Sequence, residues 1–478
     1  MAFTSLNFLI FFPLTALFYW LTPVKYRWAT LLFASYFFYL NTKPVFALLL
    51  AGVTLTTYIL TRIIDQTKLE SKKRSILVLT VVSILLPLLF FKYFTVINNG
   101  ILDLLEFYHL RWPLPEIKFL LPVGISFYTF MAIGYTLDVY NEEIEAEKNI
   151  GLLGLFISFF PLILSGPIER AKNMIPQFKA QKGVDYGMIT QGLKLILWGY
   201  FMKLVVADRL GIYVDAVYNN ISQHNGISLL LASIYYPFQI YADLGGYSLI
   251  AIGTAKILGF DVMQNFKRPF FATSMAEFWR RWHISLISWL TDYVYTPLSF
   301  YFRKYKIWGI VTALMITFLI SGIWHGAALT FIIWGLMQGI FLSIEALTNK
   351  RKTLFEKKYN LSNKGWYILL GIILTFVLFT ASQVFGRAAN LKEAFQVYTR
   401  IFTDTHHLPY KDGQTMLYSA IGLAIIFITE FRDEFFPRRF LLFENKKLFI
   451  RWLSYYTVIF LILYLGVFGN EKFIYFQY

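Results

Sequence analysis

The chain has 478 residues, of which 57% carry hydrophobic side chains and only 15% are charged, whereas a soluble domain has roughly a quarter of its residues charged. This composition, with a mean hydropathy of +0.55, excludes an ordinary soluble protein and indicates an integral membrane protein. The formal charge of +16 comes from short basic clusters between apolar runs, where the positive-inside bias and anionic lipid headgroups account for it, so we expect no nucleic-acid partner.

Apolar runs long enough for a helix to cross a bilayer recur along the whole chain. A hydrocarbon core of ~30 Å needs about 20 apolar residues per helix, and a window of that length gives roughly ten to twelve spans. The runs are continuous, which favours helices over the alternating strands of an outer-membrane barrel. The predicted spans are Leu6–Leu21, Phe46–Ile64, Ile76–Ile97, Phe119–Val139, Leu152–Ile168, Ile189–Val206, Leu229–Ile257, Ile307–Ile323, Ala327–Leu347, Trp366–Val384, Leu417–Thr429 and Ile450–Val467. A further run, Trp28–Leu40, is short and predicts a tilted or incomplete span.

These runs predict an all-α polytopic membrane protein that forms a single domain over residues 1–478. Its sections are N-terminal helices in 1–118, a motif-bearing core in 119–348 and C-terminal helices in 349–478. The first run lacks a basic leading region and a convincing cleavage site, so we interpret it as a retained helix.

The segments between the spans are basic, polar or amphipathic. We predict basic loops at 65–74, on the cytoplasmic side, and at 350–364, and a polar loop that contains His406 and His407. The mixed segment 98–118, with a surface His109, is predicted to lie at the interface. Residues 261–306 are amphipathic and aromatic, which indicates re-entrant or interfacial helices.

The run Leu152–Ile168 is interrupted twice, at Pro161 and again at Gly166-Pro167. Proline cannot continue a helix without losing a hydrogen bond, and non-helical backbone at membrane depth must be satisfied by protein or by a water-filled cavity. We favour a break that points into the protein over a simple loop boundary.

Polar residues gather inside the apolar run Leu229–Ile257, where Gln239, Tyr241 and Asp243 precede two adjacent glycines. Ionisable residues within a span commonly mark a functional site. Asp243 could equally be a structural group that holds neighbouring helices together, and the sequence leaves both interpretations open.

A basic and aromatic cluster follows at Phe278-Trp279-Arg280-Arg281-Trp282-His283. One interpretation is a headgroup anchor at the membrane interface. The other is that Arg280 and Arg281 bind an anionic donor such as a phosphate-bearing cofactor while His283 assists the transferred group. Trp282 is then a candidate for lining the site or binding the donor. Glu277 and Asp292 are close enough in sequence to orient His283, although sequence proximity does not establish contact.

His325 lies in Ser321-Gly322-Ile323-Trp324-His325-Gly326, with apolar residues on both sides. A lone histidine in such a run is often a satisfied core residue, but an intramembrane ionisable group is a functional candidate. The glycines let backbone or ligand approach closely, and an imidazole with an ordinary pKa near ~6.5 can act as a general base at neutral pH. We therefore place His325 and Trp324 among the site residues.

Other signatures are absent from the sequence. The chain has no cysteine, which excludes a disulfide, a thiolate metal site and a cysteine nucleophile. It also lacks a Walker A pattern, a Gly-x-Ser-x-Gly elbow and a His-Glu-x-x-His motif. We expect no metal and no bound cofactor.

Taken together, these motifs resemble the membrane-bound O-acyltransferase family, and most of all its bacterial alginate O-acetylation type. The resemblance runs from the first spans to about Ala388. The matching stretches are Leu121 to Tyr128 with Asp138-Val139-Tyr140, Phe160-Pro161 to Ile168, Lys203 to Arg209, Tyr241-Ala242-Asp243 with Gly246-Tyr247-Ser248, Phe278 to Ser285, Asp292-Tyr293 with Pro297-Leu298, and Ser321 to Gly326.

The resemblance implies a helical chamber in which His325 matches the membrane-embedded family histidine and His283 a second one. It also implies transfer of an acyl group from a thioester to a hydroxyl, with an extracytoplasmic acyltransferase partner that modifies a polymer. Four elements depart from the family pattern, namely Gly245-Gly246, Leu249, Gln338 and the late stretch Phe385-Gly386-Arg387-Ala388. They leave both histidines intact and make the donor and the acceptor less certain.

We therefore predict a multi-pass O-acyltransferase of a bacterial inner membrane, in contact with membrane lipid. It would move an acyl group, expected to be acetyl, from acetyl-CoA or an acyl carrier protein for O-acylation of an extracytoplasmic polysaccharide, with His325 as general base. The alternatives are acylation of teichoic acid, peptidoglycan or lipid, and a transporter or flippase without acyl chemistry.

Overall fold

The computed structural model describes residues 1–41, 43–108, 121–404, 410, 412–437, 439 and 441–469. Within these ranges every regular element is a helix, which confirms the predicted all-α class. His109, His406 and His407 lie outside the described residues, as does the part 109–118 of the predicted interfacial segment 98–118. Its first part, 98–107, is helical and continues a helix that begins at Glu70.

The chain divides into two compact units. One consists of residues Met1–Leu193 and Ala251–Met263, and the other of residues Lys194–Ile250 and Gln264–Tyr478. Each unit is described by itself, and the single domain over residues 1–478 stays a prediction.

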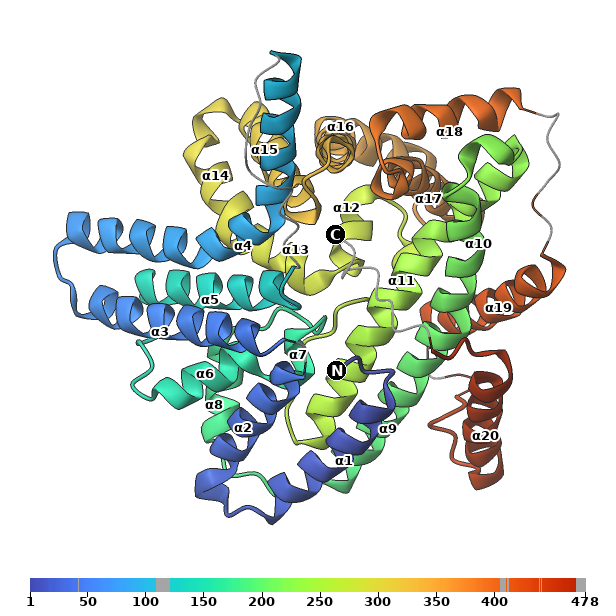
Figure 1. The fold of residues 1–478 in the computed structure, drawn as a ribbon. Helices are drawn as coiled ribbons and strands as arrows, with labels where there is room; N and C mark the ends of the chain where they lie inside the picture. Colours follow the sequence, from blue (N-terminus) through green and yellow to red (C-terminus); the bar gives the residue numbers. More distant parts are fainter. Residues whose placement is uncertain are drawn as a thin grey trace. The chain divides into compact units, whose positions relative to one another are not determined.

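The first unit contains the N-terminal helices. They are α1 (Leu6–Leu21), α2 (Arg27–Leu40), α3 (Pro44–Gln66), α4 (Glu70–Phe107), α5 (Ile125–Tyr140), α6 (Ile150–Ser158), α7 (Phe160–Ile163) and α8 (Ala171–Lys179). Helices α3, α4 and α5 pack side by side (Figure 1). Helix α5 is buried on nearly all sides, which suits a run whose polar and apolar residues are not segregated by helical period.

The predicted interruption of the run 152–168 is confirmed. Helix α6 ends at Ser158, and Pro161 stands in the first turn of the short helix α7, where a missing amide hydrogen costs little. The amide of Phe160 donates to the hydroxyl of Ser35 on α2, at 3.1 Å. Neighbouring protein therefore satisfies the broken backbone, as a break inside a bundle requires.

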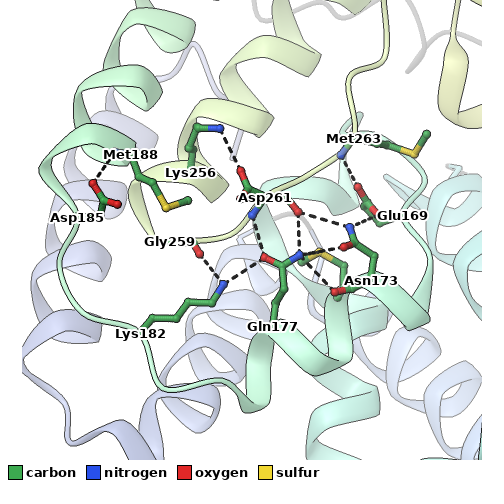
Figure 2. A network of polar contacts seen from close by, with 11 residues as sticks. Glu169, Asn173, Gln177, Lys182, Asp185, Met188, Lys256, Gly259, Asp261 and Met263 are labelled. Atoms are coloured by element: carbon green, nitrogen blue, oxygen red, sulfur yellow. Dashed lines mark hydrogen bonds and ion pairs between the residues drawn. The ribbon is translucent and has the colours of Figure 1, made fainter.

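A polar network fixes the loop that leaves the C-terminal end of the long helix α11 (Gly226–Ile257). Gln177 of α8 donates to the carbonyl of Asp261 and accepts from its amide, both at 2.9 Å, and accepts from Lys182 at 3.1 Å (Figure 2). Glu169 accepts from the amide of Met263 and from Asn173. The segment 258–263 is thus held by side chains of α8 and its flanks.

Helices α9 (Tyr186–Tyr200) and α11 have residues in both units. The remaining helices belong to the second unit, namely α10 (Asp208–Tyr218), α12 (Met275–Arg281), α13 (Ile284–Leu290), α14 (Thr296–Tyr301), α15 (Ile307–His325), α16 (Leu329–Tyr359), α17 (Gly365–Arg387), α18 (Leu391–Thr403), α19 (Gly413–Phe435) and α20 (Leu448–Leu465). Two π-helices, Phe201–Ala207 and Thr291–Tyr295, interrupt this series. The short helices α12 to α14 match the predicted amphipathic stretch 261–306.

Seven helices in the described ranges are long and apolar enough to cross a membrane, namely α3, α4, α15, α16, α17, α19 and α20. This number is below the predicted ten to twelve because several apolar runs form shorter or interrupted helices. Helix α1 has 16 residues, and the run 150–163 is split between α6 and α7.

The predicted basic loop at 350–364 is wrong over most of its length, since α16 continues to Tyr359. The segment is rich in lysine, arginine, leucine and glutamate, which have high helix propensity, and Lys352 lies 3.9 Å from Glu356 one turn later. In the same way α4 begins at Glu70, inside the loop predicted at 65–74.

Candidate active site

His325 is the last residue of α15, and glycines decide what surrounds it. A Cβ on Gly322 would lie 2.5 Å from the carbonyl oxygen of Phe331 and 3.2 Å from the Cα of Gly335. Only glycine therefore lets α15 and α16 approach this closely. The approach seats the imidazole against α16, with ring centroids 4.8 Å from Trp334 and 6.4 Å from Phe331.

His283 occupies the turn between α12 and α13. Its backbone is left-handed, with φ 45° and ψ 50°, a conformation that is uncommon for residues other than glycine. Its side chain is 1% exposed, so a headgroup anchor does not describe this residue. Burial lowers the pKa of His283 to about 3, because desolvation disfavours the imidazolium. The ring is therefore neutral at pH 7.

The two histidines, which are 42 positions apart in sequence, line one cavity of about 40 Å³, with room for a few water molecules. The other lining residues come from α11, α12, α13, α16, α17 and the turns beside them. They are Tyr236, Ile240, Trp279, Trp282, Leu286, Phe331, Trp334, Gln383 and Gly386.

Aromatic rings make up most of the cavity wall. The predicted site residue Trp324 is not among the lining residues, but its ring lies near both histidines, with centroids 4.6 Å from His325 and 6.5 Å from His283. The hydroxyl of Tyr236 donates to the carbonyl of Gly386, another lining residue, at 3.2 Å. In such a weakly polar environment a charge that develops during a reaction interacts strongly with any nearby dipole.

The two predicted arginines have different surroundings. Arg280 is exposed, whereas Arg281 pairs with Glu277 at 2.6 Å and with Glu434 of α19 at 2.9 Å. Glu434 also pairs with Arg268 at 2.7 Å. Arg281 thus belongs to a network of alternating charges that holds α12 to the end of α19.

The two acids that were considered as partners of His283 differ in their surroundings. Glu277 accepts from the amide and the hydroxyl of Thr273, both at 2.8 Å, in addition to Arg281. Asp292 is exposed on the π-helix Thr291–Tyr295, whereas His283 is buried. The role of orienting the imidazole stays a prediction for both acids.

The three polar candidates on α11 lie beside the cavity and do not line it. Tyr241 donates to the carboxylate of Glu430 on α19, and Gln239 packs against Gly211 of α10. Asp243 pairs with Lys203 at 2.7 Å. The cavity instead receives Tyr236 and Ile240 from this helix.

Lys203 joins Asp243 and Asp208 in a buried ionic triad, with both Nζ to Oδ1 distances at 2.7 Å. The three side chains are between 1% and 5% exposed. Residues five apart face different sides of an α-helix, but Lys203 lies in the π-helix Phe201–Ala207, whose wider turn brings i and i+5 together. The sequence left a functional and a structural interpretation of Asp243 open. This geometry supports the structural one.

Sequence reasoning missed several residues of the cavity wall. Trp279 and Tyr236 stand within stretches that were singled out, but their side chains could not be assigned to the cavity. The sequence could have indicated Gln383, since an amide in the apolar run 366–384 needs a polar environment. It could not have indicated Trp334, because an aromatic residue in a membrane span is common. Within the described ranges, no group of three or more histidine or acidic residues could hold a metal ion.

The fold and the cavity define a multi-pass helical membrane protein with two histidines in a largely apolar site. The chain belongs to the membrane-bound O-acyltransferase family, MBOAT, whose sequence model matches residues 50–386. This membership confirms the predicted family and makes the protein an acyltransferase.

Individual relatives agree with this assignment. The chain is 34% identical over 409 residues to the protein named probable alginate O-acetylase AlgI of Pseudomonas aeruginosa, with 84% of this chain and 75% of that protein covered. It is 32% identical over 429 residues to the peptidoglycan O-acetyltransferase of Helicobacter pylori, with 83% and 77% covered. Identity to the teichoic acid D-alanyltransferase of Bacillus subtilis is 29% over 264 residues, with 53% and 65% covered.

Proposed function

We propose that the protein transfers an acetyl group from a cytoplasmic thioester, acetyl-CoA or an acyl carrier protein, to a hydroxyl acceptor, for O-acetylation of an extracytoplasmic polysaccharide. The observation that carries the proposal is the meeting of His283 and His325 in one aromatic cavity, in a chain whose family transfers acyl groups. Relatives that are named for O-acetylation cover more than four fifths of this chain, which favours acetyl over D-alanyl transfer.

The reaction follows from His325 acting as general base. Its imidazole takes the proton of the acceptor hydroxyl while that oxygen attacks the thioester carbonyl carbon. The carbon–sulfur bond then breaks, and the leaving thiolate takes the proton from the imidazolium. No protein acyl intermediate is needed, which suits a chain without cysteine.

His283 has a supporting role in this scheme. A neutral imidazole can donate one hydrogen bond and accept another, so it can bind the acceptor hydroxyl or the developing oxyanion without adding charge. The cavity of about 40 Å³ has room for only a few water molecules, and hydrogen bonds in such a weakly solvated site are stronger than in water.

The departure of Gln338 from the family pattern does not reach the cavity. This side chain is fully buried and donates to the hydroxyl of Ser382 at 2.6 Å, and it is not among the lining residues. The substitution therefore gives no reason to abandon acyl transfer.

The partner and the location of the enzyme complete the proposal. The protein would lie in the inner membrane of a bacterium and pass the acetyl group to an extracytoplasmic acyltransferase that modifies the polymer. Acylation of peptidoglycan, teichoic acid or lipid, and transport without chemistry, are the competing outcomes.

The test compares His325→Ala with His224→Ala in membranes of cells that express the full chain. His224 contacts the ring of Tyr410 and does not line the cavity, so it is a matched control. We expect His325→Ala to lower acetyl transfer by about 100-fold or more, the usual size of a general-base effect, and His224→Ala to leave it unchanged.

Two measurements separate the alternatives. Release of free thiol from acetyl-CoA or from an acetylated carrier protein identifies the donor, and the ester content of each extracellular polymer identifies the acceptor. Wild-type turnover by normally inserted His325→Ala protein would refute the base assignment. Substrate movement without ester formation would favour a transporter.

A further inference from the structure

The turn at His283 holds an unfavourable backbone conformation at a buried position. Left-handed backbone at a residue other than glycine persists only where the surrounding structure imposes it. His283 has φ 45° and is 1% exposed. Something next to this turn must therefore impose its conformation.

Asn265 is the residue that makes the contacts on the far side of the turn. Its backbone carbonyl accepts from the amide of Ile284 at 2.8 Å. Its side-chain Oδ1 accepts from the amide of Ser285 at 3.2 Å and from the Ser285 hydroxyl at 2.9 Å. Three hydrogen bonds thus tie one asparagine to the two residues that follow His283.

The same side chain is itself anchored to α11. The Nδ2 of Asn265 donates to the hydroxyl of Ser248 at 2.9 Å. Asn265, Ser248 and Ser285 are each at most 2% exposed, so water does not compete for these bonds. Helix α11 also supplies Tyr236 and Ile240 to the cavity, and Asn265 therefore links two of its walls.

The residues next to Asn265 support the near side of the turn. The amide of Lys267 donates to the carbonyl of Arg281 at 2.8 Å. The ring of Phe266 lies edge-on to Trp282, with centroids 5.2 Å apart, and 6.2 Å from the ring of His283. The segment 265–267 thus contacts the chain on both sides of His283.

We propose that Asn265 is a positioning residue for His283. It acts through hydrogen bonds to Ile284, Ser285 and Ser248, which hold the left-handed turn and keep the imidazole in the cavity beside His325. The hydrogen bonds of Asn265 hold the turn whether or not the protein transfers acyl groups. Only the effect of Asn265 on catalysis rests on the proposed function.

The first test measures the position of His283 without any enzyme assay. Full-length protein in detergent is treated with diethyl pyrocarbonate, and modification of each histidine is followed by peptide mass spectrometry. Asn265→Ala removes the side-chain bonds, and we expect His283 to react at least about tenfold faster than in the wild type, a change of about 1.4 kcal/mol in protection.

Asn225→Ala is the matched control. Asn225 is 5% exposed, and its Oδ1 accepts from the amide and the hydroxyl of Ser228, both at 2.9 Å. It thus makes the same kind of contact as Asn265, but with a serine at the start of α11 and not with the turn at His283, so its loss should leave His283 protected. Equal protection of His283 in Asn265→Ala and Asn225→Ala would overturn the proposal.

Should Asn265→Ala fail to insert, Ser285→Ala deletes a single bond to Oδ1 and leaves the asparagine in place. We then expect a smaller increase in the reactivity of His283, in the same direction. Reactivity equal to that of the wild type would contradict the proposal.

The second test asks whether Asn265 acts through His283. We expect Asn265→Ala to lower acetyl transfer about tenfold, and His283→Ala with Asn265→Ala to be no slower than His283→Ala alone. Additive losses would mean that Asn265 acts elsewhere. If the wild type transfers no acetyl group, the proposed function fails, while the protection of His283 still decides the role of Asn265.

Discussion

Replacing Lys203 by methionine should destabilise the second unit severely. The ammonium lies 2.7 Å from one oxygen each of Asp208 and Asp243, and at an effective dielectric constant of about 20 each such contact corresponds to about 6 kcal/mol of Coulomb attraction. Most of this attraction offsets the cost of burying the charges. Removing the cation leaves two buried carboxylates without it, which costs about 3–5 kcal/mol in the free energy of unfolding.

Two further variants show that the effect comes from uncompensated charge. Asp208→Asn leaves one cation with one anion, and its amide oxygen can still accept from Lys203, so we expect a loss of only about 1 kcal/mol. Lys256→Met is the exposed control, because Lys256 lies 3.0 Å from Asp261, whose side chain is 74% exposed. Exposed pairs contribute at most about 1 kcal/mol.

The assay is equilibrium unfolding of the purified full chain in mixed micelles, followed by tryptophan fluorescence. The expected order of stability is wild type, then Lys256→Met and Asp208→Asn, then Lys203→Met well below them. Equal stabilities of Lys203→Met and Lys256→Met would refute the reasoning, because the triad would then contribute no more than a surface pair.

Two other predictions concern the turn at His283 and the packing of α11. The pKa of histidine is about 6.5 in the unfolded chain, whereas burial lowers the pKa of His283 to about 3 in the folded protein. Between these two pH values the unfolded chain binds more protons than the folded one. The free energy of unfolding therefore falls as pH decreases, by up to about 1.4 kcal/mol per pH unit. His283→Gln should reduce this slope between pH 7 and 5, and unchanged slopes would contradict the shift. A Cβ on Gly246 would lie 2.8 Å from the carbonyl oxygen of Gly199 and 3.1 Å from the amide nitrogen of Lys203, so Gly246→Ala should cost about 1–3 kcal/mol in thermal or denaturant unfolding. Gly365→Ala, with open space at its Cβ position, should cost nothing, and equal behaviour of the two would count against close packing there.

The helices that the sequence predicts best are those with long apolar runs. Ile307–Ile323 and Trp366–Val384 were each predicted to within a few residues of α15 and α17, because burial in lipid needs continuous apolar surface. The end of α16 was missed since its last turns are charged and resemble a loop by hydropathy alone, although their helix propensity is high.

The candidate site was predictable only in part. His325 stood out because an ionisable residue in an apolar run is expensive. The basic and aromatic cluster singled out His283 but left a headgroup anchor open, and resemblance to a known family strengthened the catalytic interpretation. The partner of Asp243 could not be read from the sequence, since Lys203 is 40 positions away and reaches Asp208 through a π-helix that the 3.6-residue period does not anticipate. Asn265 carried no signal, because a single asparagine before a basic cluster is ordinary.

The small volume of the histidine cavity also bears on side reactions. A thioester is open to attack by water as well as by an alcohol, and an imidazole that activates one can activate the other. With room for only a few water molecules, the small site limits the supply of the competing nucleophile. If acetyl transfer takes place here, the aromatic walls limit hydrolysis of the thioester by water. Their contribution would be measured as the ratio of ester formed to thioester consumed.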